Sequence, residues 1–263
     1  MAEILYICNK LNHLNRAMRR ALLLFTLLLT TALLAVGQGT KVDFDKKMQE
    51  YNLVDIQTLK GGEDIVVCLK YSTTDNFVGK DMYGELERAY FTQDFAHKVI
   101  RAQRILKSKN PDLTLLIYDA ARPISVQRYM RSLVDGTELQ DFVADGTKGG
   151  RHNFGVAVDL TIAYNTGEPL DMGAGFDDFT DAAAVKGTSD TNDSANRNFK
   201  VYSDYINGLV KRGLISVSAA KNRLLLIEVM LEAGLYPYRR EWWHFEELTP
   251  IGEVRKARKL LNF

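Results

Sequence analysis

The residues best suited to chemistry lie in one short stretch, from Arg151 to Asp159. A histidine, His152, stands seven positions before the aspartate. A fully extended run of this length would separate the two side chains by about 23 Å, and two turns of helix by roughly 10 Å. Both separations are too long for one small ion, so the chain must bend, and Asn153 and Gly155 are residue types that tolerate a bend. Taken alone, the stretch equally fits a loop histidine and a strand-end aspartate with no shared task.

A second cluster of polar and aromatic residues occupies positions 239–246, Arg-Arg-Glu-Trp-Trp-His-Phe-Glu. His244 from this cluster, together with His152 and Asp159, gives two imidazoles and one carboxylate and leaves a fourth position for water. Catalytic zinc is held in this way, and it lowers the pKa of its water to about 7. Glu241 precedes His244 by three positions, so a turn would bring its carboxylate to the same water as a general base. The neighbouring tryptophans and phenylalanine would wall such a site, or form an ordinary core cluster.

Arg122 supplies a candidate positive charge. It lies in the run Asp-Ala-Ala-Arg-Pro at 119–123, directly after a predicted strand at 113–118. A fixed guanidinium at a strand end would stabilise the oxyanion that develops on a scissile carbonyl. Asp119 would orient that guanidinium, or would instead cap the helix that begins near Pro123. An ordinary surface ion pair is the alternative role for the arginine.

These motifs, taken in order, resemble those of the D-alanyl-D-alanine dipeptidase family, the VanX-like zinc D,D-dipeptidases. The resemblance covers roughly residues 64–245 and rests on four motifs: Thr-Asp-Asn-Phe-Val-Gly at 74–79, Asp-Ala-Ala-Arg-Pro at 119–123, the stretch 152–159, and Glu-Trp-Trp-His at 241–244. It implies one Zn²⁺ per chain on His152, Asp159 and His244, with Glu241 as catalytic base and Arg122 stabilising the transition state. It also implies an α+β domain with the zinc cleft over the sheet.

The resemblance further implies how a small D,D-dipeptide would be held. The family places an acid that binds the substrate amine in the loop after the central motif, here Asp177 within residues 167–191; Asp178 and Asp171 compete for the role. A solvated, turn-rich connection is the alternative for this loop. Family members use the neighbourhood of Gly150 and Arg151 to hold the substrate, so the resemblance implies that both bind it. Gly150 stands where the family usually has serine, which bears on the fine specificity.

Two other functions share these motifs. One is a D,D-carboxypeptidase or a peptidoglycan endopeptidase on the same scaffold. The other is a non-catalytic cell-wall binding module with a structural metal. Glu241 and Arg122 argue against the module, because a structural site needs neither. Dipeptidase and carboxypeptidase differ in whether the cleft is closed beyond the amino end of the substrate.

The elements that must position these residues are predicted from hydrophobic spacing and from Gly, Pro and Asn punctuation. The fold we expect is a single domain in which helices pack on a small, mostly antiparallel sheet, which is the α+β class. His97 is expected on a helix face and not as a ligand. The predicted strands are residues 65–71, 113–118 and 156–162, and the predicted helices are 86–109, 123–131, 194–212, 216–233 and 251–261.

The first 39 residues have the layout of a secretory signal peptide. Arg16, Arg19 and Arg20 precede an uncharged apolar run at 21–36, and small residues follow it. The run is shorter than the roughly 20 residues that span a membrane, so we expect cleavage, leaving residues 40–263 as a periplasmic or secreted domain without stable membrane insertion. An uncleaved signal acting as a membrane anchor is the alternative, and Met18 is an alternative start.

Charge and cysteine content narrow the possible partners. Of the 34 basic and 33 acidic residues, four basic and one acidic lie in residues 1–39, so the remainder has a net charge near −2. A near-neutral chain without a basic block gives no reason to expect nucleic acid as a partner. Cys68 is the one cysteine after residue 39, so no disulfide is expected within that domain, and its apolar neighbours predict burial.

Overall fold

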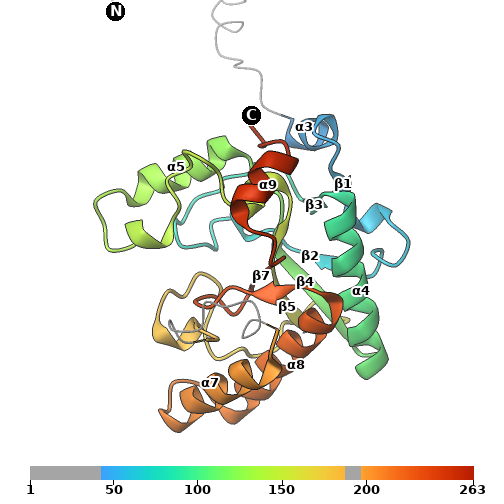
Figure 1. The fold of residues 1–263 in the computed structure, drawn as a ribbon, viewed down its shortest axis with the longest axis vertical. Coiled ribbons are helices and arrows are strands. Elements are labelled where there is room, and N and C mark those ends of the chain that lie inside the picture. The colour runs from blue at the N-terminus through green and yellow to red at the C-terminus, as the bar shows by residue number, and fades with distance from the viewer. Residues whose placement is uncertain (1–42, 187–196) are drawn as a thin grey trace, which may run out of the picture. The chain divides into compact units, whose positions relative to one another are not determined.

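A mixed five-stranded sheet is the centre of the computed structural model, which describes residues 43–186 and 197–263 (Figure 1). Only β2 and β4 run parallel to each other; the other neighbouring pairs are antiparallel. The sheet and its helices form one α+β domain over residues 44–263, as predicted. The strands lie in the order β2 (Val66–Val67), β4 (Leu113–Asp119), β5 (Ala157–Tyr164), β7 (His244–Glu246) and β6 (Tyr236–Pro237).

The two long strands, β4 and β5, are central because their sequences are apolar on both faces. Every residue of β4 is buried, and every residue of β5 except Tyr164. They pair antiparallel from Leu113 opposite Tyr164 onward, and the register shifts between Ile117 and Asp119. This irregularity, a β-bulge, places Asp119 opposite Asp159 at the end of the strands where the candidate site residues gather.

Helices cover the sheet and extend beyond its ends. The helix α4 (Gln93–Lys109) packs on β4 and on α8 (Val217–Ala233), and α8 packs on α7 (Phe199–Lys211). In Figure 1, α5 (Ile124–Val134), α9 (Ile251–Ala257) and α3 (Phe44–Glu50) lie toward the opposite end from α7 and α8. Two more strands, β1 (Val54–Asp55) and β3 (Tyr90–Phe91), form a separate antiparallel pair. The 3₁₀ turns are η1 (Ile56–Thr58), η2 (Lys70–Ser72), η3 (Gln140–Phe142), η4 (Arg151–Phe154) and η5 (Asp181–Ala183).

Several predicted boundaries were wrong, for identifiable reasons. The strand predicted at 65–71 keeps only Val66–Val67, because η2 turns the chain away after two residues. The helix predicted from residue 86 begins at Gln93, because Tyr90–Phe91 pair with β1 instead. The helix predicted to residue 261 ends at Ala257, and Leu261 instead donates its backbone N–H to the Asn153 carbonyl at 2.9 Å.

Smaller differences complete the comparison. Cys68 is exposed and not buried, because it follows the edge strand β2 at the point where the chain leaves the sheet. The helix predicted at 123–131 runs on to Val134, and that predicted at 194–212 begins at Phe199, residues 194–196 lying outside the described part. His97 lies exposed on α4, as predicted.

The predicted signal segment, residues 1–39, lies outside the described residues. Within the part that the structure describes, no helix has the length and apolar content needed to cross a membrane.

Candidate metal and active site

The bend predicted between His152 and Asp159 is present. His152 lies on the 3₁₀ turn η4, which ends at Gly155 in the left-handed conformation, with φ of 68°. A Cβ at that glycine would approach Leu53 Cδ2 to 2.9 Å, so both the backbone angle and the packing require glycine. The chain then enters β5, whose third residue is Asp159.

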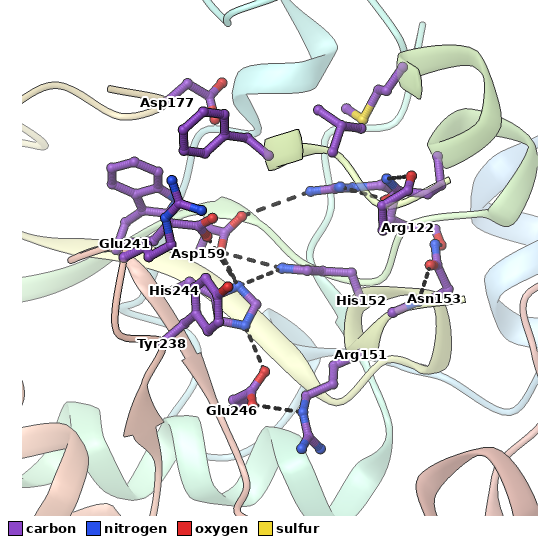
Figure 2. Close-up of a pocket in the computed structure, with 18 of the residues that line it drawn as sticks. Arg122, Arg151, His152, Asn153, Asp159, Asp177, Tyr238, Glu241, His244 and Glu246 are labelled. Atoms are coloured by element: carbon purple, nitrogen blue, oxygen red, sulfur yellow. Dashed lines mark hydrogen bonds and ion pairs between the residues drawn. The ribbon is translucent and has the colours of Figure 1, made fainter. Parts of the chain in front are cut away.

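His152, Asp159 and His244 converge at the end of the sheet (Figure 2). Asp159 and His244 are direct cross-strand partners on β5 and β7. The His244 Nδ1 atom lies 3.0 Å from Asp159 Oδ1 and 3.1 Å from His152 Nε2, and the last two atoms are 3.3 Å apart. All three side chains are buried. Within the described residues they form a group whose ligand atoms lie within 4.8 Å of one another, close enough to hold one metal ion.

The outer hydrogen bonds of the two histidines show that this group fits a cation. His152 Nδ1 lies 2.7 Å from the Ala120 carbonyl, which can only accept, so Nδ1 carries the proton and Nε2 presents a lone pair. His244 Nε2 lies 3.0 Å from Glu246 Oε2, so its Nδ1 likewise presents a lone pair. Two lone pairs and a carboxylate oxygen therefore face one another, an arrangement that requires a positive charge between them.

The pKa shifts of the group reflect the same convergence. Burial acts to raise the pKa of Asp159, yet the adjacent imidazoles hold it far below its usual range. Burial acts to lower the pKa of His244, yet its hydrogen bonds to Asp159 and Glu246 raise it to about 10. Both shifts have one cause, which is that positive charge is favoured beside the Asp159 carboxylate. The donor set of two nitrogens and one carboxylate oxygen is one that catalytic zinc uses.

Glu241 lies at the edge of this group and outside its centre. The turn predicted between Glu241 and His244 is present: the His244 N–H approaches the Glu241 carbonyl at 3.4 Å. The Glu241 Oε2 atom is 3.9 Å from His244 Nδ1, beyond hydrogen-bond range. Burial raises the pKa of the Glu241 carboxyl to about 6. Such a carboxyl can both accept and return a proton near neutral pH.

Arg122 is held rigidly beside the group. Its Nε and Nη2 atoms donate to Asp119 Oδ2 at 3.1 and 2.5 Å, and Nη1 donates to Gln127 Oε1 at 2.8 Å. The Nη2 atom also lies 3.9 Å from Asp159 Oδ2. Of the two roles considered for Asp119, the geometry supports orientation of the guanidinium, because the N-cap position of α5 is Pro123 and has no side-chain cap. Tyr83 donates to the other Asp119 oxygen at 2.7 Å.

Asp177 is the aspartate of the long loop that lines the central cavity, which has a volume of about 340 Å³. Its backbone φ of 60° is in the left-handed region, which aspartate tolerates better than most residues. Tyr71 donates to Oδ1 at 3.0 Å and the Phe77 N–H donates to Oδ2 at 3.2 Å. Burial raises the pKa of this carboxyl to about 7. Asp171 and Asp178 instead accept from the N–H groups of nearby loop residues, and neither lines the cavity.

Gly150 and Arg151 also line the cavity. A Cβ at Gly150 would find only Asn153 Oδ1 within 4 Å, at 3.9 Å, so the position has room for the serine usual in the family. Arg151 directs its Nε toward Glu246, at 2.8 Å from Oε1.

Aromatic rings form much of the cavity wall. Trp243 is buried and makes edge-to-face contacts with Phe176 and Phe179. Trp243 lines the cavity, whereas Trp242 packs behind it, with 5.5 Å between the ring centroids. Of the two roles considered for these tryptophans, Trp243 therefore forms the cavity wall and Trp242 belongs to the core.

Among the cavity-lining residues that were not predicted, Tyr71, Gln127 and Glu246 bond directly to predicted site residues. Each touches a predicted site residue through a side chain that the topology brings in. Glu246 had a usable signal, because residues i and i+2 of a strand share a face and His244 is two positions earlier. Tyr71 is the last residue of the strand predicted at 65–71, but nothing in the sequence pairs it with Asp177, and the helix pattern at 123–131 does not single out Gln127.

Comparison with known proteins identifies the class. A family model described as D-ala-D-ala dipeptidase, Peptidase M15, matches residues 49–254. The chain is 31% identical to the D-alanyl-D-alanine dipeptidase of Escherichia coli K12, over 70% of this chain and 79% of the relative. It is 24% identical to the D-alanyl-D-alanine dipeptidase of Synechocystis sp. PCC 6803, over 56% of this chain and 64% of the relative. These matches identify a peptidase. The chain belongs to the D-Ala-D-Ala dipeptidase family.

Proposed function

We propose that this protein is a zinc-dependent dipeptidase that hydrolyses D-Ala-D-Ala and related D,D-dipeptides. The observation that carries the proposal is the small cavity that has Asp177 among its lining residues together with the His152, Asp159 and His244 group. A cavity of about 340 Å³ suits a small ligand. The names of the relatives, both D-alanyl-D-alanine dipeptidases, support the choice of substrate.

Substrate would be placed by its amino end. Asp177 would accept hydrogen bonds from the free ammonium, a charge-assisted contact. Tyr71 and the Phe77 N–H, both bonded to Asp177, would hold that carboxylate at a fixed distance from the metal ligands. The aromatic wall around Trp243 would exclude water from the peptide bond and so strengthen the electrostatic contacts.

His152, Asp159 and His244 would hold one zinc ion. When bound there, zinc supplies a water of lowered pKa and polarises the scissile carbonyl. Glu241 would take a proton from the attacking water and deliver it to the leaving amine, a task suited to its pKa of about 6. Arg122, fixed by Asp119 and Gln127, would donate hydrogen bonds to the developing oxyanion.

The proposed setting is cell-wall peptide turnover outside the cytoplasm. Its support is the signal-like segment at residues 1–39, and the alternative is a domain anchored by an uncleaved signal. Mapping the N-terminus of the protein from cell fractions would separate the two.

The decisive experiment compares three substrates with purified protein: D-Ala-D-Ala, its N-acetylated form, and a muropeptide ending in the same dipeptide. A dipeptidase cleaves the free dipeptide, loses activity with a chelator and recovers it with Zn²⁺, and is poor on the other two. Equal cleavage of the free and N-acetylated dipeptides would overturn the proposal and identify a carboxypeptidase with an open cleft.

A further inference from the structure

An ion pair links the two segments that carry the histidines. Arg151 precedes His152 on η4, and Glu246 follows His244 by two residues on β7. Arg151 Nε lies 2.8 Å from Glu246 Oε1, and the other Glu246 oxygen lies 3.0 Å from His244 Nε2 (Figure 2). The side chains of Arg151 and Glu246 are 13% and 25% exposed, so solvent screens the pair less than it would a surface pair.

We propose that Arg151 and Glu246 form a positioning pair that prepares the metal site before the metal arrives. Glu246 holds His244 in the tautomer that presents Nδ1 to Asp159, and Arg151 holds Glu246 in place. Because the two residues sit on different segments, the pair also sets the separation between the His152 and His244 rings. This inference rests on the proposed metal-dependent function.

The contacts of each oxygen support a positioning role. One Glu246 oxygen forms the ion pair with Arg151 and the other forms the hydrogen bond with His244, so a single orientation of the carboxylate satisfies both contacts. His152 gets the corresponding support from the Ala120 backbone carbonyl, which cannot move independently of the sheet. The His244 ring depends instead on a side chain, and a side chain needs a partner to stay fixed. Carboxylates that bind a ligand histidine in this way typically contribute 10- to 100-fold to metal affinity.

The competing role for Arg151 is to bind the carboxylate of the substrate. Its Nη1 atom is buried and has no hydrogen-bond partner among the described residues, so a donor is available. In Figure 2, however, the guanidinium lies beyond Glu246, on the side of the cluster opposite Asp177. The two roles differ in their effects: a substrate contact changes KM and leaves metal affinity unchanged, whereas a positioning pair changes metal affinity.

The adjacent residue provides a matched control. Glu247 forms an ion pair with Lys98, with Nζ 2.6 Å from Oε1, and within the described residues it makes no hydrogen bond or ion pair with either histidine. Glu247→Gln therefore removes a neighbouring carboxylate charge and an ion pair without touching the site. Unfolding curves of all variants report whether any loss is merely a loss of fold.

The test measures Zn²⁺ affinity by competition with a chromophoric chelator. We expect Glu246→Ala to weaken binding by 10- to 100-fold, Arg151→Ala to weaken it less, and Glu246→Gln to retain part of the affinity through its amide oxygen. The Arg151→Ala/Glu246→Ala double variant should bind Zn²⁺ as tightly as Glu246→Ala alone, because the two residues act as one unit. Affinity within twofold of wild type for Glu246→Ala, or an effect as large in Glu247→Gln, would overturn the inference, as would a KM change alone in Arg151→Ala.

A second measurement does not depend on catalysis or on zinc. Nitrogen chemical shifts of the His244 ring in metal-free protein report its tautomer. We expect a single Nε2–H form, or an Nε2-bonded imidazolium, in wild type and a mixture in Glu246→Ala. Identical ring spectra in the two proteins would refute the pair even if wild type bound no zinc. A different result would separate the inference from the proposed function. If wild type neither binds zinc nor cleaves dipeptide, but Glu246→Ala still changes the tautomer of the His244 ring, only the proposed function is refuted.

Discussion

Replacing Asp177 with asparagine should stabilise the protein at alkaline pH while it weakens substrate binding. Asparagine keeps the shape of the side chain and tolerates the φ of 60° as aspartate does, so the change removes charge without a new backbone cost. The carboxylate is half-buried beside the aromatic wall, and within the described residues its hydrogen-bond donors are the Tyr71 hydroxyl and the Phe77 N–H. Neither partner carries a positive charge.

The magnitude follows from the pKa of Asp177. Burial raises it from 3.8 to about 7 in the folded protein. Between those values the folded state holds a proton that the unfolded state has lost, so the free energy of unfolding falls as pH rises through this window. Three pKa units correspond to about 4 kcal/mol, an upper bound that partial solvation reduces to roughly 2 kcal/mol. Asparagine does not titrate, so the unfolding free energy of the variant does not fall in this pH window.

Urea unfolding of both proteins at pH 5, 7 and 9 measures the effect. At pH 5 the folded carboxyl is still protonated but the unfolded one is largely ionised, so the variant should already show about a third of its full advantage. At pH 9 the variant should be more stable by about 2 kcal/mol. The measurement uses metal-free protein, because a bound cation in the cavity would lower the pKa of Asp177 and move the window. Asp178→Asn is the control, since Asp178 accepts only from a loop N–H and does not line the cavity.

The difference in unfolding free energy between the two proteins, compared at pH 5 and pH 9, tests this account. The same stability difference at pH 5 and pH 9 would refute the buried-carboxylate account. In the same variant, KM for D-Ala-D-Ala should rise roughly 10- to 150-fold, the equivalent of losing a charge-assisted contact of 1.5–3 kcal/mol. KM of the wild type should itself fall as pH rises through about 7, because Asp177 must be ionised to hold the ammonium.

Four further predictions test the site directly. His152→Ala should lose zinc, as measured by metal analysis after dialysis; full retention would exclude His152 as a ligand, and the same holds for His244→Ala. Glu241→Ala should keep zinc and fold but lose about 10²–10⁴-fold in kcat, and a near-normal rate would exclude it as the base. Arg122→Lys, which keeps the charge but not the two-pronged contact with Asp119, should lower kcat by up to roughly 10²–10³-fold with little change in KM; an unchanged kcat would rule out the oxyanion role. Gly150→Ser should fold with unchanged stability, since a Cβ meets nothing closer than 3.9 Å, and should alter KM if this position contacts substrate; a large loss of stability would contradict the open space described there.

The convergence of His152, Asp159 and His244 could be predicted because it depends on residue type and on one local bend. A histidine-poor chain offers few candidates, and Gly155 marks the bend in the sequence itself. The long central strands were predictable for a similar reason, since apolar and β-branched residues dominate both. The class of site and the class of fold were therefore accessible from the sequence alone.

The supporting contacts could not be predicted because they join distant parts of the chain. Gln127 meets Arg122 only because α5 folds back over the strand end, and Tyr71 meets Asp177 across 106 positions. Strands of two or three residues, such as β2 and β6, are set by pairing and not by any pattern of their own. The same applies to Cys68, whose apolar neighbours indicated burial although the sheet edge lies there.

The hydrogen bonds of Leu261 bear on when, during synthesis of the chain, the proposed metal site can form. Its N–H donates to the Asn153 carbonyl and its own carbonyl accepts from the Ile124 N–H, so it braces both the turn that carries His152 and the helix that follows Arg122. These residues leave the ribosome more than a hundred positions earlier. The first half of the site therefore lacks both this support and its second histidine until residues 244–261 have been synthesised. We expect the proposed metal to enter only after these residues have been made and, if the chain is exported as proposed, to be taken up in the compartment that it reaches.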